Sequence, residues 1–253
     1  MKITFLGTGT SQGVPVIGCT CDVCCSLDFR DKRLRTSIHL DINGISLVID
    51  TGPDFRQQMI REGISKLDAV LFTHAHRDHT AGLDDVRAFN FMQQKSMPVY
   101  GTIETLSQIK SDFAYIFGPK NYPGLPQVEL HTISEETFSV HNLTITPLPV
   151  LHFRLPVHGF RIGNFSYITD AKIIPDSTIQ RLTGTEILVL NALQREQHIS
   201  HFNLNEALDM VKMIKPKKTY FTHISHKLGR HATLEKELPD DVQLAFDGLR
   251  LSL

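Results

Sequence analysis

"LFTHAHRDHTAGLDD", residues 71–85, is the stretch that decides the fold of this 253-residue chain. It completes a continuous apolar run of buried-strand length and then turns toward a helix. His74 and His76 lie two residues apart in the extended part, so their side chains point the same way and can reach one metal ion. Asp78 and His79 follow in the turn, where they can reach a second. Imidazole and carboxylate ligands suit zinc, manganese or iron far better than calcium. A polar loop of chance composition is the alternative, which the strand-to-turn context disfavours.

The composition is that of a soluble globular protein, with 41% hydrophobic and 21% charged residues. A formal net charge of −1 provides no basic field that would hold nucleic acid or an anionic membrane. The opening MKITFLGTGTSQG lacks the pattern of a secretory signal peptide, and no apolar run approaches the ~20 residues that cross a bilayer. We therefore expect a cytoplasmic protein, in a compartment where disulfides are rare.

No low-complexity linker or composition break divides the chain, so we expect a single domain over residues 1–253. Short alternating runs predominate early, including the hairpin signal Asn43-Gly44, while helices and strands alternate late. This order favours an α/β fold with mixed sheets and outer helices over a doubly wound fold. Strands are expected at 2–7, 37–50 (a hairpin), 67–73, 128–133, 138–150, 159–170, 185–192, 217–224 and 242–253, and helices at 53–63, 102–117, 177–184, 203–215 and 233–238.

Residues 118–127, rich in proline and glycine, are expected to form a loop. Tyr122 in this loop either stacks on a base or sugar of a substrate or belongs to an ordinary surface loop.

The histidine motif resembles the His-x-His-x-Asp-His signature of the metallo-β-lactamase superfamily. The resemblance implies an αββα sandwich of two mixed β-sheets flanked by helices. It also implies a histidine after a middle strand, an aspartate at a strand end and a histidine after a late strand, and His152, Asp170 and His223 match these positions. The implied ligands are His74, His76 and His152 for one metal, Asp78, His79 and His223 for the other, and Asp170 between the two.

Such a ligand set is that of a dinuclear metal-dependent hydrolase. Two metals ~3.5–4 Å apart hold a bridging water and lower its pKa from 15.7 toward ~7, and the hydroxide attacks an electrophile that the metals polarise. Asp78 is then catalytic as a metal ligand, and the sequence does not choose between zinc and manganese.

The opening FLGTGTSQGVP, residues 5–15, resembles the phosphodiesterase branch of the superfamily, which includes the tRNA 3′-processing endonucleases. It is not a nucleotide P-loop, because no Gly-Lys-Ser/Thr follows. That branch places a histidine before a late helix, and His201 matches by position, with His198 nearby as the alternative. A histidine there can protonate the leaving oxygen of a phosphodiester, a general-acid contribution of ~10²–10⁴ in rate.

All four cysteines lie in residues 18–26. Cys19, Cys21 and Cys24 have the spacing of a chelate, but a structural zinc needs four ligands. His226 in THISH completes a set that resembles the PhnP-type phosphoribosyl cyclic phosphodiesterases, in which such residues bind a structural zinc. Cys25 is either a spare thiol or an alternative ligand. A Cys21–Cys24 redox pair is the rival interpretation, although no helix N-terminus follows to depress a thiol pKa.

The sequence thus predicts a phosphodiesterase for a small, compact diester such as phosphoribosyl 1,2-cyclic phosphate, with two active-site zinc or manganese ions and one structural zinc. The expected partner is that substrate, with no stable nucleic-acid complex and no membrane; a homodimer stays open. The main rival function is a tRNA 3′-processing endonuclease, although the span FRLPVHGFRIGNFSYIT leaves no room for a tRNA-binding arm. A β-lactamase or thioesterase would leave His201 and the cysteines unexplained, and the intact ligand set disfavours a metal-binding regulator without turnover.

Overall fold

The computed structural model describes residues 1–118 and 124–253, so Tyr122 lies outside the described residues. These residues form two compact units. Unit 1 comprises Met1–Leu6, Thr36–Ser134 and Gly248–Leu253, and unit 2 comprises Gly7–Arg35 and Glu135–Asp247. Each unit carries one sheet, and the two are described separately below. The single domain expected over 1–253 stays a prediction.

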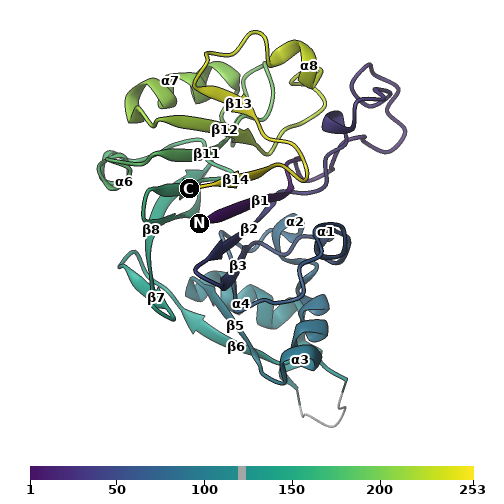
Figure 1. Cartoon of the computed structure of the whole chain (residues 1–253), viewed down its shortest axis with the longest axis vertical. Coiled ribbons are helices and arrows are strands. Elements are labelled where there is room, and N and C mark those ends of the chain that lie inside the picture. The colour runs from purple at the N-terminus through teal and green to yellow at the C-terminus, as the bar shows by residue number, and fades with distance from the viewer. Residues whose placement is uncertain (119–123) are drawn as a thin grey trace. The chain divides into compact units, whose positions relative to one another are not determined.

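The sheet of unit 1 has seven strands in the order β14-β1-β2-β3-β4-β5-β6 (Figure 1). The hairpin predicted at Asn43-Gly44 is present, since β2 and β3 pair antiparallel and both turn residues have positive φ. From β3 to β6 the strands run parallel, whereas β1 pairs antiparallel with β14. The strands are β1 Lys2–Gly7, β2 Ser37–Ile42, β3 Ile45–Ile49, β4 Ala69–Leu71, β5 Met97–Gly101, β6 Val128–Thr132 and β14 Arg250–Ser252.

Helices cover this sheet because each turns an apolar stripe toward it. Val48, Val70 and Val99 of the strands pack in one core with Phe55 of α1 and Phe89 of α3. Gly63 ends α1 in the left-handed conformation that glycine adopts without cost. The helical segments are α1 Phe55–Glu62, α2 Arg77–Thr80, η2 Leu83–Val86, α3 Arg87–Gln93, α4 Ile103–Asp112 and α5 Ala114–Phe117.

The sheet of unit 2 also has seven strands, in the order β13-β12-β11-β10-β9-β8-β7. Strands β10 to β13 run parallel and β7 to β10 antiparallel, so this sheet is mixed as well. Leu204, Ala207 and Val211 of α7 pack on Leu190 and Phe221 of the sheet. The elements are η1 Phe29–Asp31, β7 Phe138–Val140, β8 Leu143–His152, β9 Leu155–Ile162, β10 Phe165–Tyr167, α6 Asp176–Arg181, β11 Ile187–Asn191, α7 Leu204–Ile214, β12 Lys218–Thr222, α8 His231–Leu234 and β13 Val242–Leu244.

Two mixed sheets flanked by helices confirm the predicted α/β fold class. Several predicted elements were wrong in extent: the helix expected at 102–117 is two helices, α4 and α5, and the strand expected at 138–150 is two strands, β7 and β8. The sequence did not predict α3 and β5. The strand expected at 242–253 is two short strands, β13 and β14, which belong to different sheets. The helix expected at 233–238 begins at His231 and ends at Leu234. Among the helices that the structure describes, none has the length and apolarity that crossing a membrane requires.

Candidate metal centres

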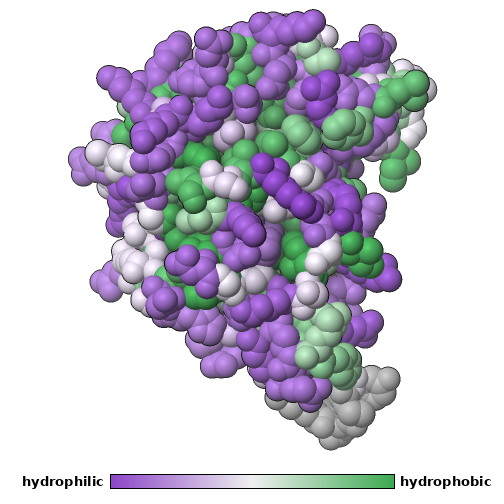
Figure 2. All heavy atoms as spheres, in the orientation of Figure 1, coloured by the Kyte–Doolittle hydropathy of each residue, from purple (hydrophilic) through white to green (hydrophobic). Residues whose placement is uncertain are grey.

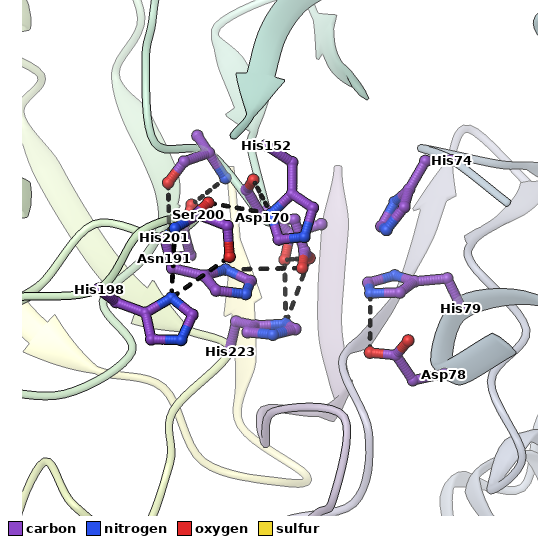
Figure 3. Close-up of polar contacts among 12 residues, drawn as sticks. His74, Asp78, His79, His152, Asp170, Asn191, His198, Ser200, His201 and His223 are labelled. Carbon is purple, nitrogen blue, oxygen red and sulfur yellow. Dashed lines mark hydrogen bonds and ion pairs between the residues drawn. The ribbon is translucent and has the colours of Figure 1, made fainter. Parts of the chain in front are cut away.

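Unit 1 brings together the four residues of the histidine motif at the turn that follows β4. The ring centroids of His74 and His76 lie 4.5 Å apart, and those of His74 and His79 lie 4.3 Å apart. Asp78 Oδ2 lies 3.3 Å from His79 Nε2 (Figure 3). His76 caps α2 in extended conformation, so the chain changes from strand to helix within the motif, as predicted.

Asp50, at the end of β3, orients the imidazole of His79. Its carboxylate accepts from His79 Nδ1 at 2.8 Å, from the Thr73 N–H at 2.9 Å and from the Thr73 hydroxyl at 2.8 Å. Burial raises the pKa of Asp50, and these three donors oppose that shift by favouring the carboxylate. With the proton of His79 on Nδ1, its Nε2 is the atom that can bind a metal.

Thr73 fixes the tautomer of His74 in the same way. The threonine has one hydroxyl proton and donates it to Asp50, so toward His74 Nδ1, 3.0 Å away, it can only accept. His74 therefore carries its proton on Nδ1 and presents Nε2. The chain after the motif also packs closely on the segment after β3, because a Cβ on Gly82 would meet the carbonyl oxygen of Gly52 at 2.2 Å.

In unit 2, His152 ends β8 and donates its Nδ1 proton to main-chain oxygens. Nδ1 lies 2.9 Å from the carbonyl oxygen of Ser200 and 3.1 Å from that of Asp170. Carbonyl oxygens accept only, so Nε2 of His152 is again the atom left to bind a metal. The N–H of Ser200 points toward His198 Nδ1 at 3.3 Å, which places the proton of neutral His198 on Nε2 (Figure 3).

Asp170 follows β10 in a left-handed conformation, with φ of 58°. Asn191, at the end of the parallel neighbour β11, forms two hydrogen bonds with the main chain of Ala171, the residue after Asp170. Its Oδ1 accepts from the Ala171 N–H at 2.8 Å, and its Nδ2 donates to the Ala171 carbonyl at 2.9 Å. The Asp170 carboxylate itself accepts from the Thr169 hydroxyl at 2.7 Å. The side-chain amide of Asn191 thus pairs with the main chain as a neighbouring strand would, and this pairing fixes the position of Asp170.

His201 lies within the unit 2 cluster and is 8% exposed. Its ring is stacked on that of His223 at 4.8 Å and lies 4.5 Å from that of His152. Its Nδ1 is 3.6 Å from Asp170 Oδ1. Burial, and then the neighbouring His223, lower the pKa of His201 to about 3. Ligand-type atoms of His152, Asp170 and His201 lie within 4.8 Å of one another, so His201 is close enough to be a ligand as well as an acid.

His223 follows β12 and also has a positive φ, 56°. Its Nδ1 lies 3.3 Å from Asp170 Oδ2. The residue after it is held by the N-terminal loop, since the Ile224 N–H donates to Thr8 at 2.8 Å and the Thr10 N–H donates to Ile224 at 3.1 Å. The glycine-rich opening therefore holds the segment of a candidate ligand in place.

A second cluster lies wholly within unit 2. The Sγ atoms of Cys19 and Cys21 lie 3.3 Å from His226 Nδ1, and Cys24 Sγ lies 3.5 Å from it. The four ligand atoms thus converge on one point, while Cys25 is exposed. Hydrogen bonds from the Cys24 N–H and from His226 lower the pKa of Cys21 to about 6, whereas burial raises the pKa of Cys24 to about 11.

The loop that carries these cysteines has little core of its own. Among the described residues its buried apolar cluster consists of Val14, Val23 and Cys24. Ile17 and Leu27 are fully exposed, and apolar atoms stand out at the upper right of Figure 2, where Figure 1 draws this loop.

Sequence reasoning did not single out Asp50, Thr73, Asn191 or Ser200. Asp50 and Asn191 share a signal: each polar side chain ends a run of buried apolar residues. At the carboxyl end of a parallel strand such a residue faces the end of the neighbouring strand. In this protein a candidate metal ligand lies there.

A protein family described as "Beta-lactamase superfamily domain" matches residues 46–224. A solved structure of a diphosphatase from the PhnP family is 42% identical, with a TM-score of 0.93 over 100% of this chain and 97% of its own. An octanoyltransferase of Porphyromonas gingivalis is 38% identical over 252 residues, 98% of this chain and 51% of that protein. A ribonuclease Z of Methanococcus maripaludis is 28% identical over 160 residues, 60% of this chain and 46% of that protein. The chain spans about half the length of these two curated relatives.

Proposed function

The chain belongs to the β-lactamase superfamily and is a metal-dependent hydrolase of that fold, as its sequence predicts, and we propose that it hydrolyses a small phosphodiester. The likeness to a PhnP-family diphosphatase over the whole chain and to ribonuclease Z over part of it supports chemistry at phosphorus. Phosphoribosyl 1,2-cyclic phosphate represents the proposed class. A tRNA 3′-processing endonuclease is the second candidate, favoured by the ribonuclease Z relative and disfavoured by the short connection between His152 and Asp170.

One observation carries the proposal: three histidines in the two units have the tautomer of a metal ligand. His74, His79 and His152 each commit Nδ1 to an oxygen acceptor, which leaves Nε2 with its lone pair. Histidines that bind metals almost always donate their other nitrogen in this way. A surface cluster of histidines without a metal has no reason to share one tautomer.

The donor set of imidazoles and carboxylates fits zinc or manganese. We propose that His74, His76 and His152 hold one cation, that Asp78, His79 and His223 hold the other, and that Asp170 serves both. When bound, such cations polarise a phosphoryl oxygen and lower the pKa of a water nucleophile to near ~7. Asp50 and the Ser200 carbonyl then keep the ligands in orientation, and Asn191 holds Asp170 in place.

His201 is the proposed general acid, and His198 is the alternative. Burial favours the neutral ring of His201, so an acid role requires that the ring take up a proton from solvent when the substrate binds. The negative charge of a phosphoryl group beside the ring favours the protonated form. His201→Gln should therefore slow an alkyl diester about 100-fold more than a nitrophenyl diester, whose leaving group needs no proton. An equal loss on both substrates would assign His201 to binding instead.

The cysteine–histidine cluster is proposed to bind a structural zinc. Cys19, Cys21, Cys24 and His226 supply four ligands of the right chemistry, and a closed site of this kind leaves no position for a substrate. The small core of the loop supports this role, because a bound metal can replace missing apolar burial. Cys25 is then the spare thiol.

The function is tested by removing the metals with a chelator and restoring Mn²⁺ or Zn²⁺. Hydrolysis of bis(p-nitrophenyl) phosphate should disappear and return. The same protein should then be given a ribose cyclic phosphate, a dinucleotide, a precursor tRNA and an octanoyl thioester. Turnover of the small diesters supports the proposal, and cleavage of the tRNA alone would favour the endonuclease. Turnover of the thioester alone would favour the chemistry named for the Porphyromonas gingivalis relative. Activity unchanged by the chelator would overturn the metal-dependent mechanism.

A further inference from the structure

The hairpin turn between β8 and β9 consists of two residues, Phe153 and Arg154, and follows the candidate ligand His152 directly. The strands pair up to His152 and Leu155, so the turn is closed and its position is set by the sheet. Phe153 and Arg154 therefore lie one and two positions along the chain from His152, a ligand of the proposed metal centre.

Phe153 has a φ of 56°, a conformation that favours glycine and is an outlier for a bulky residue. Two-residue hairpins normally place glycine, asparagine or aspartate at such positions. Backbone strain of this kind gathers at functional sites. Asp50, Asp170 and His223, all at the candidate metal centres, share the positive φ. The aromatic ring of Phe153 is thus held at a position where a smaller residue would relieve strain.

The exposure of the turn adds a second observation. The Phe153 side chain is 47% exposed, and the guanidinium carbon of Arg154 lies 5.1 Å from its ring centroid. Arg154 forms no hydrogen bond or ion pair with any other residue that the structure describes. The exposed ring of Phe153 and the guanidinium of Arg154, which is unpaired among the described residues, therefore lie side by side.

Two segments that contact the end of β8 carry exposed aliphatic side chains. Ile173 is 50% exposed and belongs to a segment that pairs with Leu151, next to His152. Ile199 is 68% exposed and precedes Ser200, whose carbonyl accepts from His152. Exposed apolar side chains on the segments next to the turn favour a planar, apolar group over a bare sugar phosphate.

We propose that the turn Phe153-Arg154 determines substrate specificity by binding an aromatic base and a second phosphate of the substrate. This inference rests on the proposed phosphodiesterase function. An aromatic side chain stacks on any nucleobase, and a guanidinium pairs with phosphate through two parallel hydrogen bonds. The preferred substrate class is then a small nucleotide diester that carries a phosphate besides the one hydrolysed.

Three substrates that differ by one group at a time test this assignment in the Mn²⁺-loaded protein. They are ribose 2,3-cyclic phosphate, adenosine 2′,3′-cyclic phosphate, and the same nucleotide with a 5′-phosphate. In the wild-type protein kcat/KM should rise at each addition. Phe153→Ala should reduce the advantage of the base about 5- to 100-fold, the range of one stacking contact. Arg154→Gln should reduce the advantage of the 5′-phosphate about tenfold.

Matched controls lie on α3 of unit 1. Phe91 is 57% exposed there and Arg87 is exposed, so Phe91→Ala and Arg87→Gln should leave all three kcat/KM values unchanged. Phe153→Asn, which tolerates the positive φ, should behave as Phe153→Ala and separates loss of the ring from loss of the fold. No advantage of the base in the wild-type protein, or ratios unchanged in both turn variants, would overturn the proposal.

A binding measurement separates this proposal from the catalytic one. If the wild-type protein hydrolyses none of the three diesters, the proposed function fails. Calorimetric titration with adenosine 5′-monophosphate and ribose 5-phosphate still tests the turn. Tighter binding of the nucleotide, weakened about 5-fold or more by Phe153→Ala, would support it. Equal affinity of the wild-type and Phe153→Ala proteins for the nucleotide would overturn it.

Discussion

The candidate ligands of unit 1 and those of unit 2 are assembled in opposite ways. Unit 1 takes His74, His76, Asp78 and His79 from six consecutive residues at one strand-to-helix turn. Unit 2 takes His152, Asp170, His201 and His223 from four separate segments that the sheet brings together. A local set depends on one turn, whereas a dispersed set depends on the whole order of strands.

The support of the two sets differs accordingly. In unit 1 a buried carboxylate, Asp50, orients a ligand through its charge. In unit 2 main-chain carbonyls and the amide of Asn191 do the orienting. We therefore expect unit 1 to be most sensitive to changes of charge and unit 2 to changes of shape.

The largest expected effect comes from removing one carboxylate of each set. Asp78→Ala and Asp170→Ala should each lower kcat for a diester by roughly 10³-fold or more, since several kcal/mol of transition-state stabilisation depend on the metals. Circular dichroism should stay that of the wild-type protein. Asp209→Ala, on the exposed side of α7, is the matched control and should retain full activity. Wild-type kcat in either ligand variant would remove that residue from the proposed centre.

Substitutions of the residues that orient the ligands should affect the two units in different ways. Asp50→Asn removes the charge behind His79 and should weaken metal affinity about 10- to 100-fold, as changes to residues that orient metal ligands do. Excess Mn²⁺ should restore its kcat, because the ligand geometry survives.

Asn191→Ala should behave differently. It leaves the buried N–H of Ala171 without its partner, at about 1–3 kcal/mol, and releases the backbone of Asp170, whereas the Ala171 carbonyl still accepts from the Phe202 N–H at 2.8 Å. Its thermal midpoint should fall and excess Mn²⁺ should not restore kcat. Equal rescue of Asp50→Asn and Asn191→Ala by metal would contradict the distinction between charge and shape.

The same contrast explains what the sequence could predict. The motif from His74 to His79 can be recognised in the sequence because its candidate ligands lie close together and directly follow a predicted strand. Asp50 was missed because its role depends on the parallel pairing of β3 with β4, which brings its carboxylate to Thr73. The residues His152, Asp170 and His223 were placed only through resemblance to a family, because no spacing links segments so far apart.

The strand expected at 242–253 failed for a related reason. The run VQLAFDGLRLSL is apolar enough to predict one strand, yet its alternation changes phase at Asp247-Gly248, where the backbone changes partner from Phe221 to Phe5. Gly248, with a φ of 88°, makes the change possible. A pattern of alternating residues specifies a strand but not the sheet that receives it.

The cysteine cluster tests the comparison of local and dispersed ligand sets further, because its ligands come from separate segments of unit 2 alone. Cys21→Ser should remove one zinc per chain and lower the thermal midpoint, since the loop has little core to hold it. Cys25→Ser, one residue beyond Cys24, should change neither zinc content nor midpoint. Metal content by mass spectrometry and calorimetric scans measure both. Loss of zinc from Cys25→Ser with retention in Cys24→Ser would reassign the third thiolate.

The smallest expected effect concerns two histidines outside the candidate metal centres, half-buried His39 and buried His231. Burial lowers the pKa of both His39 in unit 1 and His231 in unit 2 to about 4. Asp41 and Glu62 near His39 favour its charged form. Around His231, Asp28 and Asp31 do so as well, but Arg33 and Arg30 oppose them, and Arg33 donates to His231 Nδ1 at 3.1 Å. His231 Nε2 faces Glu235 at 3.3 Å, so the ring is held neutral with its proton there.

His231→Gln and His39→Gln should each flatten the pH dependence of stability, and by a similar amount, because both folded pKa values are about 4. A folded pKa of about 4 lies below the unfolded value of ~6.5, so the unfolded chain binds more protons between these pH values. The contribution of His231 is complete above pH ~6.5 and is lost as the pH falls toward 4, with about 2 kcal/mol already lost at pH 5. The measurement is urea unfolding of both variants and the wild-type protein at pH 7 and pH 5. If the wild-type protein and His231→Gln lose equal stability over this range, Arg33 does not hold His231 neutral.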